Sequence, residues 1–140
     1  MPLAVPGCAF CAIAAGEAPA AAVLDEPDHV AFLDIRPLFE GHVLLCPRAH
    51  VETLPDLPPD RVAPLFQAAQ RLCVAVTEAM NAQGTFVAMN NVVSQSVPHL
   101  HVHVVPRRRK DGLRGFFWPR TKYPDQARMA AVAEAIAARL

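Results

Sequence analysis

The chain has 140 residues, the size of one ordinary domain with a single hydrophobic core. Hydrophobic residues make up 53% of the sequence and charged residues 19%, and Lys+Arg and Asp+Glu balance at 13 each, which excludes a disordered polyampholyte, a collagen or a coiled coil. Apolar stretches such as residues 43–46 are too short to cross a bilayer, and the N-terminus lacks the pattern of a secretory signal, so we expect a soluble, cytoplasmic protein.

The predicted elements, in chain order, are short strands separated or followed by helices. Apolar spacing and turn residues indicate a short helix at 8–15, a hairpin of 21–24 and 29–34, a strand at 42–46, a long amphipathic helix from 60 to about 84, strands at 86–89 and 99–105, and a C-terminal helix after Pro124. Five short strands with helices between and after them indicate an α+β domain built on an antiparallel sheet. We therefore expect residues 1–140 to form a single domain, with 111–140 as its C-terminal tail and helix.

Charge is distributed unevenly along the chain. Residues 1–60 hold nine acidic against two basic side chains, and residues 61–140 hold eleven basic against four acidic ones. Much of the basic excess lies in residues 107–122, and because no aromatic residues are interleaved with its Arg run, we interpret it as solvated and expect neither a nucleic-acid nor a membrane partner. Without a secretory signal, the four cysteines are expected to be reduced.

Three histidines alternate with apolar residues in the predicted strand 99–105. Successive strand residues point to opposite faces, so His99, His101 and His103 share one face. At roughly 3.3 Å per residue the outer two Cα atoms lie about 13 Å apart, which disfavours binding of one metal ion by all three rings. Imidazoles about 7 Å apart suit an extended polyanion instead, because one ring can attack phosphorus while its neighbours donate hydrogen bonds.

Two simpler interpretations compete with this one. A single histidine in a strand is usually structural, and a His-x-His pair is more often part of a metal site than of a covalent mechanism. Neither accounts for the third histidine, or for the amide and hydroxyl groups of Gln95 and Ser96 shortly before it.

The segment His99-Leu100-His101-Val102-His103-Val104-Val105 resembles, at every position, the His-Φ-His-Φ-His-Φ-Φ signature of the histidine triad (HIT) nucleotide hydrolases and transferases, where Φ is apolar. Residues 31–37 and 41–50 resemble the upstream block of the same family, in the same order. The resemblance covers about residues 8–106. It implies a HIT-like fold, a five-stranded antiparallel sheet with two main helices and usually a dimer, which agrees with our expectation of one long and two shorter helices.

The resemblance also implies roles for individual residues. His101 would attack the α-phosphorus of a nucleotide, which divides the displacement into two in-line steps through a nucleotidyl-imidazole intermediate. The implied catalytic set is His99, His101, His103 and Ser96, with His103 and Gln95 on phosphate oxygens and Ser96 near the leaving group. Implied ribose contacts come from Asp34 and from Asn90 or Asn91, and implied walls around the base from Phe10, Ile13 and Ile35. Asp34 would otherwise be a turn cap, and the three apolar residues ordinary core.

This sequence departs from the family pattern in the loop before the triad. Residues 90–97 are shorter than usual and lack the glycine that lets the backbone approach phosphate. Phosphoramidases, dinucleoside polyphosphate hydrolases and phosphorylases differ at this loop and at the C-terminus, so the substrate branch stays open. Residues 115–119, which are rich in aromatics, would either contact a leaving group or pack the tail.

Some members of the family carry a structural zinc held by a Cys-x-x-Cys pair and two histidines. Cys8, Cys11, His50 and His99 occupy the matching positions, so the resemblance implies Zn²⁺ in a structural role and no organic cofactor. The alternative is a chance pair of cysteines on an Ala-rich helix.

We therefore expect an enzyme that cleaves at the α-phosphate of a purine nucleotide derivative, either a nucleoside phosphoramidate or a dinucleoside polyphosphate. The resemblance further implies a homodimer with its interface around residues 61–80. The alternative function is a nucleotide- or zinc-binding interaction protein with little turnover, and the presence of both His101 and Ser96 favours the enzyme.

Overall fold

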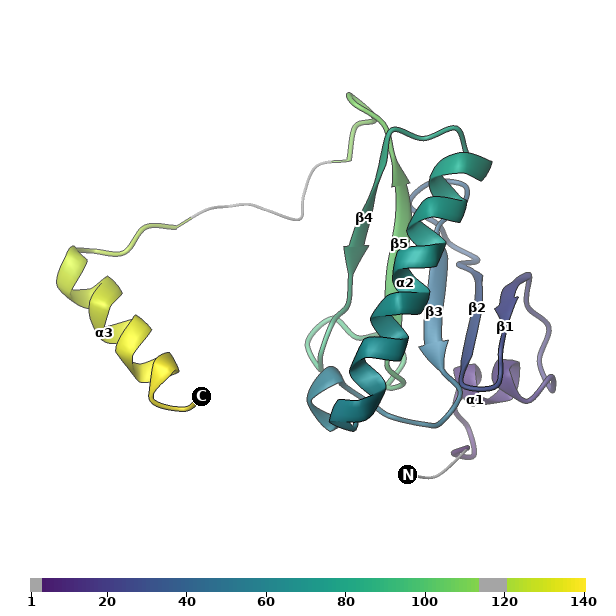
Figure 1. Ribbon diagram of the computed structural model, residues 1–140, viewed down its shortest axis with the longest axis horizontal. Coiled ribbons are helices and arrows are strands. Elements are labelled where there is room, and N and C mark those ends of the chain that lie inside the picture. Colours follow the sequence, from purple (N-terminus) through teal and green to yellow (C-terminus); the bar gives the residue numbers. More distant parts are fainter. Residues whose placement is uncertain (1–3, 114–120) are drawn as a thin grey trace.

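The computed structural model describes residues 4–113 and 121–140. Its centre is a five-stranded antiparallel sheet in the order β1-β2-β3-β5-β4, which confirms the predicted fold class (Figure 1). Along the chain the elements are α1 (Ala9–Ala14), β1 (Ala22–Asp25), β2 (His29–Leu33), β3 (Val43–Pro47), a short 3₁₀ helix (Leu54–Asp56), α2 (Pro59–Ala79), β4 (Gly84–Ala88), β5 (Val102–Arg107) and α3 (Gln126–Ala137).

The strand that carries the triad differs from the prediction, because it begins at Val102 and not at His99. Val102 pairs with Leu45, and before this point the chain leaves the sheet, where the Leu100 N–H donates to the Val51 carbonyl over 2.6 Å. Of the three triad histidines, only His103 therefore lies inside the paired strand. Alternation of side chains along the strand, which predicted one shared face, does not by itself place the other two.

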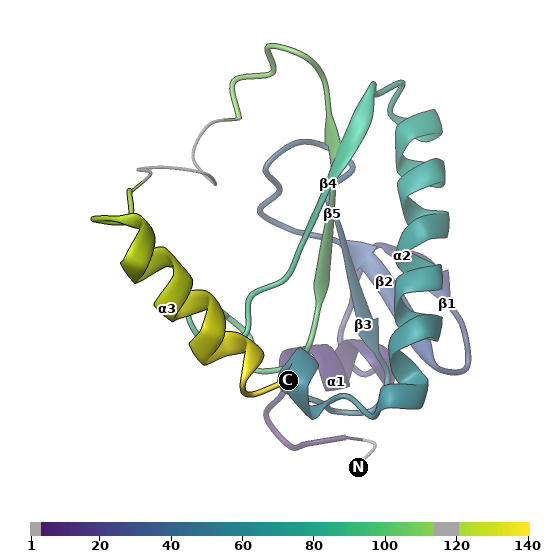
Figure 2. The same ribbon diagram turned by 60° about the vertical axis from the view of Figure 1, so that its left-hand side comes forward.

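Different helices pack against the two faces of the sheet. On one face, alternate residues of β2, β3 and β5 form the main core with the buried side of α2, which runs along the sheet (Figures 1 and 2). On the other face, a smaller cluster joins Phe10 of α1 to residues of β2 and β3: Val30, Phe32, Leu44 and Cys46. His103 faces this second side, because it pairs with Leu44 across the sheet. The second face therefore carries His103 next to a pocket that the smaller cluster leaves open.

The C-terminal helix α3 lies apart from the sheet (Figure 1), and none of its residues is buried. It begins directly after Asp125, which caps it by accepting a hydrogen bond from the Arg128 N–H at 2.7 Å. In the basic stretch, Arg107 pairs with Asp111 at 2.6 Å. The aromatic segment 115–119 lies outside the described residues. No helix in the described part of the chain is long and apolar enough to span a membrane.

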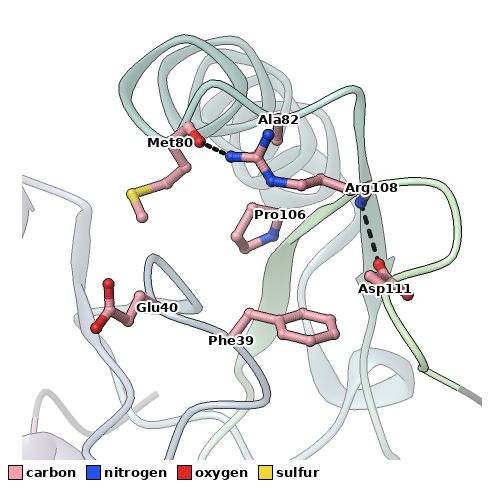
Figure 3. Close-up of a pocket in the computed structure, with 7 residues that line it drawn as sticks. All are labelled: Phe39, Glu40, Met80, Ala82, Pro106, Arg108 and Asp111. Carbon is pink, nitrogen blue, oxygen red and sulfur yellow. Dashed lines mark hydrogen bonds between the residues drawn. The ribbon is translucent and has the colours of Figure 1, made fainter.

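A pocket of about 230 Å³ lies where the β2–β3 connection meets the end of α2 (Figure 3). Phe39, Met80 and Pro106 line it, and the Arg108 side chain closes one side by donating to the Met80 carbonyl. Gly41 adjoins it with a φ of +92°, and a Cβ atom there would lie 2.6 Å from Met80 Cγ. Both the backbone conformation and the close approach require glycine at this position.

We predict that Gly41→Ala lowers the free energy of unfolding by about 2–3 kcal/mol, of which about 1 kcal/mol is the cost of a positive φ and the rest the displacement of Met80. Gly112→Ala is the matched control, because Gly112 also has a positive φ, +83°, but nothing lies within 4 Å of the added Cβ. Urea denaturation measures both. Equal losses in the two variants would contradict the proposed contact with Met80.

Candidate active site and metal cluster

His101 and His103 lie side by side on the open face of the sheet, with ring centroids 5.0 Å apart. This is closer than the spacing of about 7 Å between alternate Cα atoms of a strand, because the two rings converge. His99 points elsewhere and is fully buried. The three histidines therefore do not form a simple row: two face a pocket and one faces the N-terminal helix.

The hydrogen bond of His101 fixes which ring nitrogen is available for chemistry. Its Nδ1 lies 2.7 Å from the backbone carbonyl oxygen of His99. A carbonyl oxygen only accepts, so Nδ1 must carry the proton and donate it. The other ring nitrogen, Nε2, then has a free lone pair in the neutral ring. His101 thus has the tautomer that a nucleophile requires.

A chain of hydrogen bonds places the proton of His103 on Nε2, whereas the proton of His101 is on Nδ1. The Leu38 N–H donates to His42 Nδ1 at 3.0 Å, so the proton of the neutral His42 ring is on Nε2. His42 Nε2 in turn lies 2.9 Å from His103 Nδ1 and donates to it. The proton of neutral His103 is therefore on Nε2, which is suited to donate to an anion. Burial, together with the neighbouring His101 and His42, lowers the pKa of His103 to about 4, so this ring is neutral at pH 7.

His42 is the site residue that the sequence analysis missed. It is buried between Gly41 and the first residue of β3, and burial lowers its pKa. One signal was available: His42 precedes Leu44 and Cys46 at strand spacing, which places it on their face of the sheet. Its contact with His103, 61 residues away, depends on the pairing of β3 with β5.

A largely apolar pocket of about 370 Å³ opens beside the two rings. The structure brings together here most of the residues that the resemblance implies: Phe10, Ile13, Asp34, Ile35, Ser96, His101 and His103. The Phe10 ring contacts the rings of Phe32 and His101 edge-on, with distances between ring centroids of 5.2 Å and 5.0 Å. Helix α1 therefore forms one wall of the pocket. Ile35, at 93% exposure, lies at the rim and is not core. Flat, apolar walls of this kind suit a planar ring system.

In the loop before the triad, the side-chain amides of Gln95 and Asn91 bind backbone groups of the protein, both within the loop and in residues 52–54. Gln95 accepts from the Val92 N–H at 3.0 Å and donates to the Glu52 carbonyl at 2.6 Å, and Asn91 accepts from the Leu54 N–H at 2.8 Å. Neither lines the 370 Å³ pocket. Val92 and Ser94 have φ angles of +71° and +62°, so this glycine-free loop keeps left-handed turns at residues that disfavour them.

A second pocket of about 300 Å³ adjoins the first one. Asp34 and His103 line both pockets, whereas His101 lines only the larger one. Asn90 belongs to the smaller pocket, where its side chain also donates to the Ser94 carbonyl at 3.2 Å. Among the triad histidines, His103 thus lies at the junction of the two cavities.

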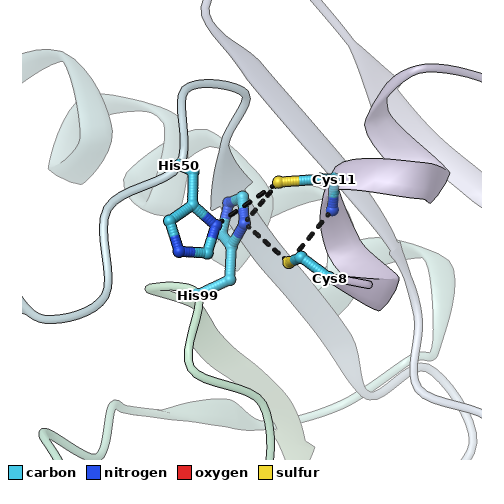
Figure 4. Close-up of side chains that lie close together, drawn as sticks. All are labelled: Cys8, Cys11, His50 and His99. Atoms are coloured by element: carbon cyan, nitrogen blue, oxygen red, sulfur yellow. Dashed lines mark hydrogen bonds between the residues drawn. The ribbon is translucent and has the colours of Figure 1, made fainter. Parts of the chain in front are cut away.

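Cys8, Cys11, His50 and His99 gather at the start of α1, with one ligand atom from each within 4.8 Å of the others (Figure 4). Cys11 Sγ lies 3.4 Å from His50 Nδ1 and 3.5 Å from His99 Nδ1. His99 Nε2 donates to the Pro47 carbonyl at 2.7 Å, so Nδ1, which faces the thiols, has the free lone pair. Two sulfurs and two imidazoles, one with its other nitrogen held by a carbonyl, fit a tetrahedral zinc ion.

Asp34, His42 and His103 also converge closely enough to suggest a metal site. The hydrogen bonds argue against it. A neutral imidazole that binds a metal through Nε2 must carry its proton on Nδ1, but Nδ1 of His42 already accepts the Leu38 N–H. An ion here would break that bond and the one between the two rings. The donor atoms therefore favour one zinc per chain, at the cysteine cluster.

The HIT domain family model matches residues 15–110. The chain belongs to the HIT family. An uncharacterized HIT-like protein of Mycobacterium tuberculosis is 41% identical over 108 residues, which cover 76% of this chain and 75% of the relative. The adenosine 5'-monophosphoramidase of Saccharomyces cerevisiae is 36% identical over 109 residues, covering 76% of this chain and 66% of the yeast protein.

Solved HIT structures share the fold. A crystal structure from Streptococcus mutans, of the protein SMU.412c, superposes with a TM-score of 0.90 at 33% identity and covers 99% of this chain and 88% of its own. A zinc-bound histidine triad protein from Mycobacterium smegmatis has a TM-score of 0.74 at 36% identity, covering 92% of this chain and 97% of its own. The likeness therefore extends from the triad to the whole domain.

We predict that the purified HIT protein contains about one zinc per chain, and that Cys8→Ala lowers both the metal content and, by about 10 °C, the Tm, since metal binding contributes directly to folding free energy. Elemental analysis and thermal unfolding measure the two effects. Cys73→Ala is the control, because Cys73 is a half-buried thiol of α2 outside the cluster. Protein that holds no zinc and has freely reactive Cys8 and Cys11 would contradict the metal site, and two zinc ions per chain would contradict the argument from His42.

Proposed function

We propose that this protein is a cytoplasmic nucleotide hydrolase or transferase that cleaves at the α-phosphate of a purine nucleotide derivative through a covalent intermediate on His101. The observation that carries the proposal is the pair of fixed tautomers at the pocket. His101 presents a lone pair on Nε2, and its neighbour His103 presents an N–H. A nucleophile and an anion-binding donor thus stand 5.0 Å apart, between ring centroids, beside an apolar cavity.

The chemistry follows from these positions. The base occupies the 370 Å³ pocket against Phe10 and Ile13, and the ribose hydroxyls bind Asp34. His101 Nε2 attacks the α-phosphorus, a nitrogen–phosphorus bond forms, and the bond to the leaving group breaks with its electron pair on the leaving group. The Nε2–H of His103 stabilises the charge on the phosphate oxygens. Water then attacks the same phosphorus and releases the nucleotide and the free imidazole.

The remaining predicted residues have supporting parts in this proposal. Ser96 lines the same pocket and places its hydroxyl near the reacting phosphate. His99 contributes its carbonyl, which sets the tautomer of His101, while its side chain belongs to the zinc cluster. A bound zinc would anchor α1 and His99, and with four protein ligands it would leave no position for water. Gln95 remains a predicted phosphate ligand, although both ends of its amide are bonded within the protein.

Two relatives support a hydrolase without fixing its substrate. One is the yeast adenosine 5'-monophosphoramidase, and another is the asymmetrical bis(5'-nucleosyl)-tetraphosphatase of Schizosaccharomyces pombe, 32% identical over 83 residues that cover 58% of this chain and 46% of that protein. Both names describe cleavage of adenosine or nucleosyl phosphate derivatives. They are consistent with either branch expected from the sequence.

We predict that His101→Gly lowers kcat by about 10³-fold or more while nucleotide binding persists, because the variant loses the covalent step but keeps the pocket walls. Ser96→Ala should lower kcat less, by about tenfold, since it removes only a positioning hydroxyl. Wild-type protein incubated with labelled nucleotide and quenched in alkali should carry acid-labile label. Wild-type kcat in His101→Gly would refute the mechanism, and nucleotide binding with neither label nor turnover would favour the interaction-protein alternative.

We also propose a homodimer whose interface includes the outer side of α2, residues 61–80. Supporting this, β4 is an edge strand, and the neighbouring helix exposes Phe66 and Val74 at 40% and 56%. Sedimentation at micromolar concentration should therefore show a species with twice the chain mass of 15.1 kDa. Phe66→Glu should shift the equilibrium from this dimer toward the monomer. A wild-type species of 15.1 kDa alone would contradict the dimer.

A further inference from the structure

Arg48, the residue directly after β3, joins three segments of the chain through its guanidinium. Its Nε–H donates to the Glu26 carbonyl at 2.6 Å, one Nη donates to the Ala14 carbonyl at 2.5 Å, and the other pairs with the Asp25 carboxylate. We propose that Arg48 is a positioning residue for the 370 Å³ pocket, because it holds the C-terminal end of α1, the helix that forms one wall there. This inference rests on the proposed function, which assigns that pocket to the base.

Helix α1 is too short to keep its position without tertiary contacts. It has six residues, and helices of this length are unstable by themselves in water. At its start, the side chains of Cys8 and Cys11 belong to the candidate metal cluster, and Phe10 packs into the smaller core. The bond from Arg48 fixes the remaining end of the helix.

The acceptor of that bond, the Ala14 carbonyl, is the last carbonyl of α1. The carbonyls of residues 11–13 accept N–H groups from residues 15–17, in the turn that follows the helix. The last carbonyls of a helix have no partner within it, and a side chain that donates to one of them ties the helix end to another element. Arg48 thereby holds both α1 and the turn that leads to Pro19 and Ala20, which line the same pocket.

The other contacts of Arg48 make it a firm anchor. Its guanidinium binds residues 25 and 26 at the β1–β2 turn, and its backbone N–H donates to the Asp28 carbonyl at 2.9 Å. The same turn is held by Arg71 of α2, which donates twice to the Glu26 carboxylate, at 2.7 and 2.9 Å. A guanidinium spreads its donors over a planar fork, whereas a lysine has a single nitrogen. The three acceptors of Arg48 therefore require arginine and not just a positive charge.

The position of Arg48 predicts which part of a ligand it affects. Arg48 does not line the pocket, so its influence on a ligand must pass through α1, whose Phe10 and Ile13 face the base in the proposed function. The ribose and the phosphate are assigned to Asp34 and His103, which are not on α1. A long-range effect of the Arg48 charge would instead act on any ligand with the same phosphate. Ribose 5-phosphate, which is AMP without the base, separates these two effects.

NMR titration with AMP and with ribose 5-phosphate tests the inference. Arg48→Gln should weaken AMP binding by about tenfold, the order of one base–aromatic contact, and ribose 5-phosphate binding by less than about twofold. Arg48→Lys should lose most of the same AMP affinity, because it keeps the charge but not the fork. It also carries the test if the glutamine variant is unfolded. The metal content should equal that of the wild type, since the cluster lies at the other end of α1.

Two control variants alter the same turn without touching α1. Arg71→Gln removes the bonds to the Glu26 carboxylate, and Asp25→Asn removes an exposed charge while the bond from Arg48 to Ala14 remains. Both should keep the AMP affinity within about twofold of the wild type, because exposed ion pairs contribute little. Equal losses in Arg48→Gln and Arg71→Gln would show that the turn, and not α1, transmits the effect, which overturns the proposal.

The outcomes separate this inference from the function on which it rests. An equal change for AMP and ribose 5-phosphate in Arg48→Gln overturns the positioning of α1, and turnover by the wild type through His101 would still stand. A wild type that binds both ligands with equal affinity also overturns it, since the base then makes no contact. If the wild type binds neither ligand and cleaves no nucleotide derivative, the proposed function itself is wrong and the inference fails with it.

Discussion

The pairing of β5 between β3 and β4 is the constraint on which the rest of the site depends. It buries Val102 and Val104 under α2 and turns His103 to the opposite face, beside His42, which directly precedes β3. A shift of this register by one residue would exchange the two faces and place the imidazole in the apolar core. The core and the site are therefore specified together, because the same alternation that packs the valines positions His103.

Three histidines of similar sequence context have three different properties because their partners differ. His99 donates from Nε2 to a carbonyl and turns Nδ1 to the thiols, His101 donates from Nδ1 and keeps Nε2 free, and His103 accepts at Nδ1. In each case the partner is a backbone group or a residue that a backbone group fixes. The backbone thereby determines which nitrogen can bind a metal, attack phosphorus or donate to an anion.

The sequence predicted the fold class and most elements because apolar periodicity and turn residues are local signals, strong in α2 and in the β1–β2 hairpin. Through a resemblance that joins distant segments, it also named seven of the fourteen residues that line the larger pocket. It did not predict that β5 starts at Val102, since only the partner strand sets where pairing begins. The contact of His42 with His103 and the bond from Gln95 to the Glu52 carbonyl likewise join residues far apart in the chain.

His99 belongs to the candidate metal cluster through its side chain and contacts the proposed nucleophile His101 through its backbone carbonyl. Its side chain is held by the Pro47 carbonyl and faces the cysteines, while its own carbonyl sets the tautomer of His101. Rotation of the His99 backbone after loss of the cluster would move that carbonyl, and His101 would lose the bond that keeps its proton on Nδ1. The metal cluster would then act on turnover through the orientation of one peptide group, without any contact between the ion and the phosphate. Because the carbonyl and the ring belong to the same residue, a bound metal would couple stability to the proposed reactivity through covalent geometry.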